Sequence, residues 1–248
     1  MPQCEPISPL DQEGYPSDVR IWLVSCAVEP EELMERLTQG ERRRLAALRQ
    51  PADRARFAAT RATMRELLGQ ELGVAPAAVR IGTGPRGKPY VESSIHGTLD
   101  ASRIVFNASH AGDYALIAIG RAESADAPRL EVGVDIERVD AQVDTDSLSA
   151  LVLSPDDVAQ LTGSSASRRQ AFFRVWTAKE AFFKALGDGI GDQLPNLSVR
   201  LPAAGTNALS ATSTDAKLAA CAQRMTLHSV DVPEGYVATL AVLRNAMG

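Results

Sequence analysis

The sequence of 248 residues predicts an α+β fold made of two similarly sized subdomains. Each half contains short, β-branched apolar runs typical of strands and at least one long helical segment. A polar connection with a proline, at residues 121–129, separates the halves. The composition, 45% hydrophobic and 23% charged, is that of a globular protein with one large core or two modest ones. We therefore expect an N-terminal subdomain at residues 1–125 and a C-terminal subdomain at residues 126–248.

The N-terminal half is expected to contain a strand, two helices and two further strands. In that order they cover residues 19–24, 30–48, 52–68, 104–106 and 114–120. The strands are apolar runs with β-branched residues, and the helices place leucines at roughly helical spacing. Gly40 interrupts the first helix, whereas Gly69 and Gly73 are expected to stop the second. Turn residues rich in glycine and proline fill residues 82–89.

The C-terminal half is expected to contain four strands and two helices. The strands cover residues 130–137, 197–201, 225–232 and 236–243, and the helices lie near 154–161 and over 168–186. Ser154 is a suitable N-cap for the first of these helices. The turn Pro233-Glu234-Gly235 predicts a hairpin between the last two strands. Residues 203–220 are weakly biased in composition and are expected to form a loop.

Charge is spread unevenly along this acidic chain, whose net charge is −5. The window from Arg36 to Arg65 carries nine arginines against Glu41 and Asp53. This excess suits an anionic ligand, although a solvated helix face is an alternative. The arginines are not interleaved with aromatic residues, so nucleic acid is not an expected partner. No stretch approaches the roughly 18 apolar residues of a membrane span, so we expect no membrane insertion and a cytoplasmic location.

Asp135 and Glu137 lie near the end of the strand predicted at residues 130–137. A strand has a period of two, so both carboxylates share one face and repel each other. Mg²⁺ prefers such oxygen ligands and commonly takes one or two carboxylates plus substrate phosphates. An alternative is an exposed strand end at which the acids pair with Arg138 or another surface base.

The segment VWTAKEAFFKALG at residues 175–187 is more distinctive. Trp176, Glu180 and Lys184 are four residues apart, so they share one helical stripe, and phenylalanines flank it. A simple Glu-to-Lys pair at this spacing contributes only about 0.2–0.5 kcal/mol when exposed. It does not explain a carboxylate on an aromatic face, where a metal or phosphate has to compensate for burial. We assign Trp176 to packing.

Two shorter segments carry groups suited to phosphate. FNASH at residues 106–110 is expected to leave a buried strand for a turn, with an amide, a hydroxyl and an imidazole as donors. Gly87-Lys88-Pro89 combines a flexible residue, a cation and a fixed backbone. Neither segment is diagnostic by itself, because a lone histidine on a turn is usually a surface residue.

In this order, GKP, FNASH, GVDIE and WTAKEAFFK resemble the motifs of the 4′-phosphopantetheinyl transferases, which move a phosphopantetheine arm from coenzyme A onto a carrier-protein serine. The length is similar to the monomeric, surfactin-synthetase-activating (Sfp-like) type, and the trimeric holo-acyl-carrier-protein synthases are much shorter. The resemblance covers roughly residues 22–243. It implies a pseudo-dimer of two similar α/β subdomains with the active site in the cleft between them.

The resemblance also implies roles for the C-terminal motifs. Asp135, Glu137 and Glu180 would bind Mg²⁺, for which Mn²⁺ can substitute, together with the coenzyme A pyrophosphate. Lys184 would contact the phosphates and steady the leaving phosphate. The carrier serine would attack the β-phosphorus and release 3′,5′-adenosine bisphosphate, with Glu180 as a candidate general base, directly or through water.

The N-terminal motifs would hold the nucleotide end of coenzyme A. The resemblance implies contacts from Lys88, Pro89 and Ser109, with His110 at the 3′-phosphate, and we assign Arg56 to the same anion site. Arginines replace lysines that some relatives carry at this end, which leaves the detailed phosphate contacts open. The segment after GVDIE also lacks an aromatic pair that relatives often carry, which leaves the docking surface for the carrier open.

The expected partners are thus coenzyme A and an apo acyl or peptidyl carrier protein, bound by a monomer. Two other functions remain possible for the same residues. A Mg²⁺-dependent pyrophosphohydrolase would use the carboxylates with water as the nucleophile, and a non-catalytic coenzyme A binder would keep the fold without turnover.

Overall fold

The computed structural model describes residues 14–92, 101–122, 124, 127–187, 189, 191–202 and 206–245. The helices are η1 (Pro30–Arg36), α1 (Gln39–Ala47), α2 (Pro51–Leu72), η2 (Pro76–Ala78), η4 (Ala101–Arg103), α3 (Thr145–Val152), α4 (Pro155–Val158), α5 (Ser165–Leu186), η5 (Leu194–Asn196) and α6 (Ala216–Ala222). The strands are β1 (Val19–Ser25), β2 (Ile81–Thr83), β3 (Pro89–Val91), β4 (Ile104–Ala111), β5 (Tyr114–Arg121), β6 (Arg129–Arg138), β7 (Leu197–Arg200), β8 (Ala208–Ser213), β9 (Met225–Val230) and β10 (Tyr236–Asn245). The strands form antiparallel sheets in the orders β1-β5-β4 and β6-β10-β9-β8-β7, together with a hairpin β2-β3.

The two halves of the chain share one topology. In the first half, β1 is followed by helices and then by the hairpin β4–β5, whose second strand pairs with β1. In the second half, β6 is followed by helices and later by the hairpin β9–β10, whose second strand pairs with β6. Each half has a 22-residue helix that ends at a left-handed glycine, Gly73 in one and Gly187 in the other. This repetition confirms the predicted α+β fold with two similar subdomains. Residues 125 and 126, where we placed the boundary, lie outside the described residues.

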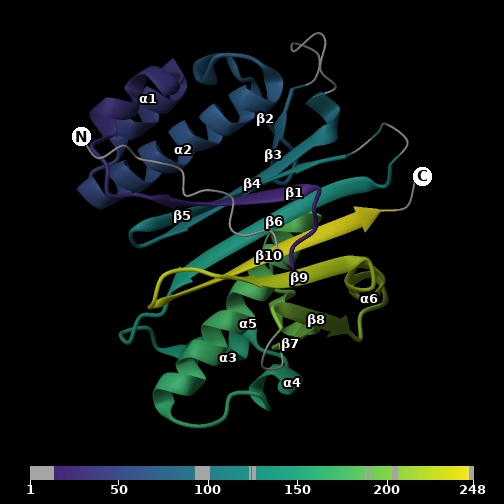
Figure 1. Ribbon diagram of the computed structural model, residues 1–248. Coiled ribbons are helices and arrows are strands. Elements are labelled where there is room, and N and C mark those ends of the chain that lie inside the picture. The colour runs from purple at the N-terminus through teal and green to yellow at the C-terminus, as the bar shows by residue number, and fades with distance from the viewer. Residues whose placement is uncertain are drawn as a thin grey trace.

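The two sheets pack against each other, and each is covered on its other face by a long helix (Figure 1). Alternate residues of one strand therefore enter different cores. In β6, the apolar residues Leu130, Val132, Val134 and Ile136 enter the core between the sheets. The alternate set on the opposite face, toward α5, is Glu131, Gly133, Asp135 and Glu137. The alternation thus places both carboxylates predicted to bind metal under one helix.

The predicted helix boundaries of the N-terminal half need correction. The first helix is broken between η1 and α1, because Thr38 forms a capping box with Glu41 and begins a new helix. Gly40 consequently lies inside the first turn of α1. The second helix continues through Gly69 to Leu72, and only Gly73, with a φ of 67°, ends it.

Three segments were assigned wrongly from the sequence. Residues 203–220 were expected to form a loop, but they contain β8 and the first part of α6. Their alanine, serine and threonine side chains produce little hydrophobic contrast. The helix α3 was missed, and β4 continues to Ala111, so FNASH lies inside a strand and does not leave it for a turn. In the described part of the chain, no helix combines the length and the apolar character that a bilayer crossing requires.

Candidate functional site

Asp135 is at the centre of the candidate site. Its side chain is buried on β6, and Oδ1 accepts hydrogen bonds from Ser109 Oγ at 2.8 Å and from Lys184 Nζ at 2.6 Å. Lys184 Nζ also donates to Ser109 Oγ at 3.2 Å. Burial raises the pKa of Asp135, while the Lys184 charge and these hydrogen bonds oppose the rise. Oδ2 is buried without a hydrogen-bond partner among the described residues, so it is available to an electropositive ligand.

The approach of α5 to β6 brings Lys184 to Asp135. Gly133 makes the approach possible, because a Cβ at this position would overlap the carbonyl oxygen of Ala181 and the amide nitrogen of Ala185. On the other side of the helix, Lys179 forms a 2.6 Å ion pair with Asp157, and both side chains are fully buried. Lys179 also donates to two backbone carbonyl oxygens, which satisfies its buried charge. The sequence analysis assigned no role to Gly133 or Lys179.

Glu137 and Glu180 complete the acidic group. Burial raises the pKa of each to about 7, and the negative charge of Asp135 adds to both shifts. For Glu137, the Glu180 charge raises the pKa further and Lys184 lowers it. Glu180 is buried on α5. The structure thus brings together the three carboxylates and the lysine that the sequence proposed, and their negative charges repel one another.

These carboxylates do not form a ready-made metal cage. Within the described ranges, no three or more His, Cys, Asp or Glu side chains converge closely enough to hold a metal ion by themselves. The ammonium group of Lys184 instead takes up one oxygen of Asp135. Magnesium often binds through one or two carboxylates and substrate phosphates. The unpaired Oδ2 of Asp135 and the repulsion between its neighbours fit a cation bound in that way.

His110 follows Ser109 near the end of β4, and its nearby charges include that of Arg56. Arg56 of α2 donates from Nη1 to the carbonyl oxygen of Gly112 at 3.2 Å and forms an ion pair with Asp53. His110 is exposed, but partial loss of hydration lowers its pKa, and the charges of Arg56 and Lys184 lower it further. The positive charges of Arg56 and Lys184 therefore act on the same imidazole. An anion next to His110 would be attracted by both.

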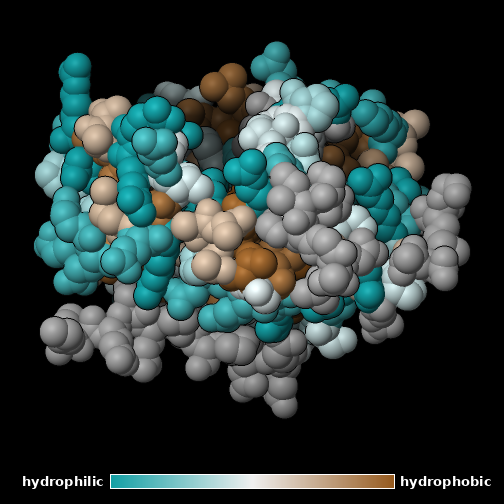
Figure 2. All heavy atoms as spheres, turned by 90° about the horizontal axis from the view of Figure 1, so that it is seen from above, coloured by the Kyte–Doolittle hydropathy of each residue, from teal (hydrophilic) through white to brown (hydrophobic). Residues whose placement is uncertain are grey.

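The surface over α1 and α2, at the left of Figure 2, is mostly hydrophilic. The arginines found by the sequence analysis belong mainly to these helices. Several of their charges are engaged within the protein: Arg61 and Arg65 both contact Glu41, at 2.6 Å each. Arg44 lies over the ring of Phe57. Part of the arginine excess is thus structural, and Arg56 is the member beside His110.

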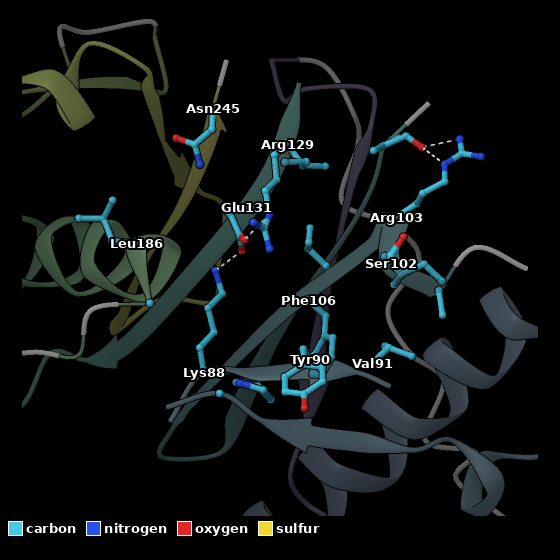
Figure 3. A pocket seen from close by; sticks show the side chains of 18 of the residues that line it. Lys88, Tyr90, Val91, Ser102, Arg103, Phe106, Arg129, Glu131, Leu186 and Asn245 are labelled. Carbon is cyan, nitrogen blue, oxygen red and sulfur yellow. Dashed lines mark hydrogen bonds and ion pairs between the residues drawn. The ribbon is translucent and has the colours of Figure 1, made fainter. Parts of the chain in front are cut away.

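Lys88 and Pro89 line a different region. They belong to a groove of about 1140 Å³ that also includes Tyr90, Arg129 and Glu131, and Figure 3 shows Lys88 reaching toward Glu131. The Lys88 ammonium group donates to Glu131 at 2.6 Å and to the carbonyl oxygen of Ala185, near the end of α5, at 2.7 Å. Burial lowers the pKa of Lys88, and the Glu131 charge opposes this shift. In this arrangement Lys88 joins the hairpin to α5.

Asn107 does not act as a free phosphate donor, contrary to the expectation for FNASH. It is buried, and its Oδ1 accepts a hydrogen bond of 3.0 Å from the amide of Val134. This bond ties β4 to β6 and places Ser109 beside Asp135. The sequence analysis also assigned no role to Tyr236, whose hydroxyl accepts a hydrogen bond from the amide of Asp113 in the turn after β4. Trp176 packs against Phe172 in the second core, as predicted.

Comparisons with known proteins indicate the family of this chain. Residues 131–241 match the family model of the 4′-phosphopantetheinyl transferase superfamily, and residues 25–122 match a model of the 4′-phosphopantetheinyl transferase N-terminal region. The chain is 32% identical to the 4′-phosphopantetheinyl transferase HetI of Nostoc sp. over 178 residues, which are 70% of each protein. It is also 32% identical to a phosphopantetheinyl transferase of Thraustochytrium sp., over 66% of this chain and 57% of that protein. A solved holo-[acyl-carrier-protein] synthase from Neisseria meningitidis aligns with 46% of this chain and 98% of its own, at 20% identity and a TM-score of 0.37.

Proposed function

The chain belongs to the 4′-phosphopantetheinyl transferase superfamily, and from this premise we propose that it transfers the 4′-phosphopantetheine group of coenzyme A to a serine of an apo acyl or peptidyl carrier protein. The observation that carries the proposal is the group around Asp135. A buried carboxylate with one unpaired oxygen lies near two further carboxylates and a lysine, all on β6 and α5, and Ser109 of β4 donates a hydrogen bond to it from the other half. Such a group can bind the pyrophosphate of coenzyme A directly through the lysine, and through a metal cation held by the carboxylates.

We propose Asp135, Glu137 and Glu180 as the residues that would hold Mg²⁺, or Mn²⁺ in its place. When bound, the ion would offset negative charge on the pyrophosphate oxygens. Lys184 supplies a cation at the same place, since its ammonium group is already within 2.6 Å of Asp135. A phosphate oxygen entering here would compete with Asp135 for this ammonium group and would become its ion-pair partner.

Glu180 is proposed to accept the proton in the transfer step. The serine oxygen forms a bond to the β-phosphorus, the bond from that phosphorus to the bridging oxygen breaks, and 3′,5′-adenosine bisphosphate leaves. The serine proton passes to the Glu180 carboxylate, directly or through one water molecule. A carboxylate close to the attacked phosphorus is a suitable proton acceptor for the serine hydroxyl.

At the nucleotide end, we propose that His110 and Arg56 bind the 3′-phosphate and that Lys88, Pro89 and Ser109 complete the contacts. The proximity of His110 to the charge of Arg56 supports the first part. Ser109 already bonds to Asp135, so it links the nucleotide end to the metal end. For Lys88 to contact the nucleotide, its ammonium group has to bind a phosphate oxygen while it keeps its ion pair with Glu131.

We further propose that residues 1–125 and 126–248 are the two subdomains and that one chain acts as a monomer in the cytoplasm, without nucleic acid or membrane partners. The repeated topology supports the division. Ser109 and Arg56 come from one half, and Asp135 and Lys184 come from the other, so one chain supplies all the groups of the proposed site.

Incubation of the protein with coenzyme A, Mg²⁺ and an apo carrier protein tests the function. A mass gain of one phosphopantetheinyl group on the carrier supports transfer. Cleavage of coenzyme A without carrier modification would instead indicate a pyrophosphohydrolase. Binding of coenzyme A with neither product would indicate a non-catalytic binder. A panel of acyl and peptidyl carriers then identifies the preferred acceptor.

A further inference from the structure

The turn between β4 and β5 contacts both subdomains. Gly112 and Asp113 form it, since Ala111 and Tyr114 are the paired residues on either side. Gly112 has a φ of 53°, and a glycine at the first central position suits the two-residue turn of a hairpin. Arg56 of the first subdomain donates to the Gly112 carbonyl oxygen. The turn therefore fixes the backbone partner of a proposed phosphate-binding arginine.

Tyr236, the first residue of β10, contacts the same turn from the second subdomain. Its hydroxyl accepts a hydrogen bond of 3.1 Å from the amide of Asp113. Its ring is perpendicular to that of Tyr114, with the centroids 5.0 Å apart. A Cβ at Gly112 would overlap the Tyr236 hydroxyl, so the turn and the tyrosine are in close contact.

The backbone of Tyr236 is itself held in place. Its amide donates to the carbonyl oxygen of Pro233 at 3.1 Å, and the preceding Gly235 accepts from Val139 at 2.8 Å. In the sheet, Tyr236 is the partner of Arg138, the residue after Glu137. The tyrosine is thus anchored on the strand pair that carries the carboxylates.

We propose that Tyr236 is a positioning residue that sets His110 and Arg56, across the junction of the subdomains, relative to Glu137. This inference rests on the proposed function, in which His110 and Arg56 hold the nucleotide phosphate and Glu137 lies at the transfer end. Tyr236 acts through the backbone of the turn and not through the substrate. Its loss should therefore weaken binding of coenzyme A and leave the chemical step nearly unchanged.

Tyr236→Phe is the sharpest test, because it removes the hydroxyl and keeps the ring pair with Tyr114. Tyr114→Phe is the matched control, since the Tyr114 hydroxyl makes no hydrogen bond within the described part of the chain. Calorimetric affinity for coenzyme A, KM, kcat and Tm are measured for both variants and the unmodified protein. We expect Tyr236→Phe to raise the KM and Kd for coenzyme A about threefold to tenfold, the effect of one lost hydrogen bond, with kcat within about twofold.

An unchanged Kd and KM in Tyr236→Phe would overturn the inference, as would an equal effect in Tyr114→Phe. A fall in Tm with unchanged affinity would show a structural role alone and would also overturn it. Failure of the proposed function is distinguishable, because the unmodified protein would then transfer nothing. If coenzyme A binds without transfer, the calorimetric comparison of both variants with the unmodified protein still decides the positioning role, and an unmodified protein that does not bind coenzyme A would overturn it.

Discussion

The hydroxyl of Ser109 donates a hydrogen bond of 2.8 Å to the carboxylate of Asp135, and this bond crosses from β4 of the first subdomain to β6 of the second. Lys184 of α5 donates to both partners. Three elements therefore meet at one carboxylate. The position of that carboxylate depends on both subdomains, so the proposed site is complete only when the halves are packed together.

Ser109→Ala should lower transfer activity by roughly 10–100-fold, the usual cost of removing a group that orients a metal ligand. The physical reason is the loss of one of the two hydrogen bonds to Asp135 Oδ1. The measurement is kcat with saturating coenzyme A and carrier. Ser210→Ala is the control, because Ser210 is an exposed serine on the strand β8. Equal activities of the two variants would contradict the orienting role.

Gly133→Ala should destabilise the protein by about 1–3 kcal/mol, the range found for overpacked sites. The added methyl group would overlap the backbone of α5 and push Glu180 and Lys184 away from β6. Gly40→Ala has open space around it and should instead add about 0.4–1 kcal/mol of stability. Denaturant unfolding of both variants measures the difference. A Gly133→Ala protein as stable as the unmodified one would show that α5 does not depend on this close approach.

The raised pKa values predict how stability changes with pH in protein freed of divalent metal by a chelator. Glu137 and Glu180 titrate near 4.5 when unfolded and at about 7 when folded, so the folded state holds more protons between these values. Their contribution to stability is complete below pH 4.5 and is lost as the pH rises through 7. Glu180→Gln removes one contribution, so its Tm should fall less between pH 5 and pH 8 than that of the unmodified protein. Parallel Tm curves for the two proteins would rule out the shifted pKa of Glu180.

Lys88→Ala should raise the KM for coenzyme A if Lys88 contacts the nucleotide. Glu131→Gln is the informative companion, because it removes the ion pair of the lysine while leaving the lysine in place. A loss of affinity confined to Lys88→Ala indicates a direct contact with the nucleotide. Equal losses in both variants would assign the effect to the ion pair of Lys88 with Glu131, which holds the lysine against the end of α5. An unchanged affinity in Lys88→Ala would remove Lys88 from the nucleotide site.

Local sequence patterns were sufficient for β6 and α5, which carry the proposed metal ligands and Lys184. The period of two in GVDIE and the four-residue spacing of Glu180 and Lys184 predict shared faces, and the structure brings these faces together. Contacts between distant segments were not predictable in this way. The bond of Asn107 to Val134 depends on how β4 packs against β6, and the role of Gly133 depends on the path of α5. The composition of residues 203–220 also did not predict β8 and α6, because their many small side chains give neither the alternation of a strand nor the apolar stripe of a helix a clear contrast.

The most direct measurement is the mass of an apo carrier protein after incubation with coenzyme A, Mg²⁺ and either the unmodified protein, Asp135→Ala or Glu180→Ala. We predict one added phosphopantetheinyl group with the unmodified protein. Each variant should lower the rate by at least ~100-fold, the lower range for loss of a group that stabilises the transition state, while circular dichroism shows the fold retained. Full transfer by folded Asp135→Ala would contradict the central role of this carboxylate, and no transfer by the unmodified protein to any carrier would contradict the proposed function.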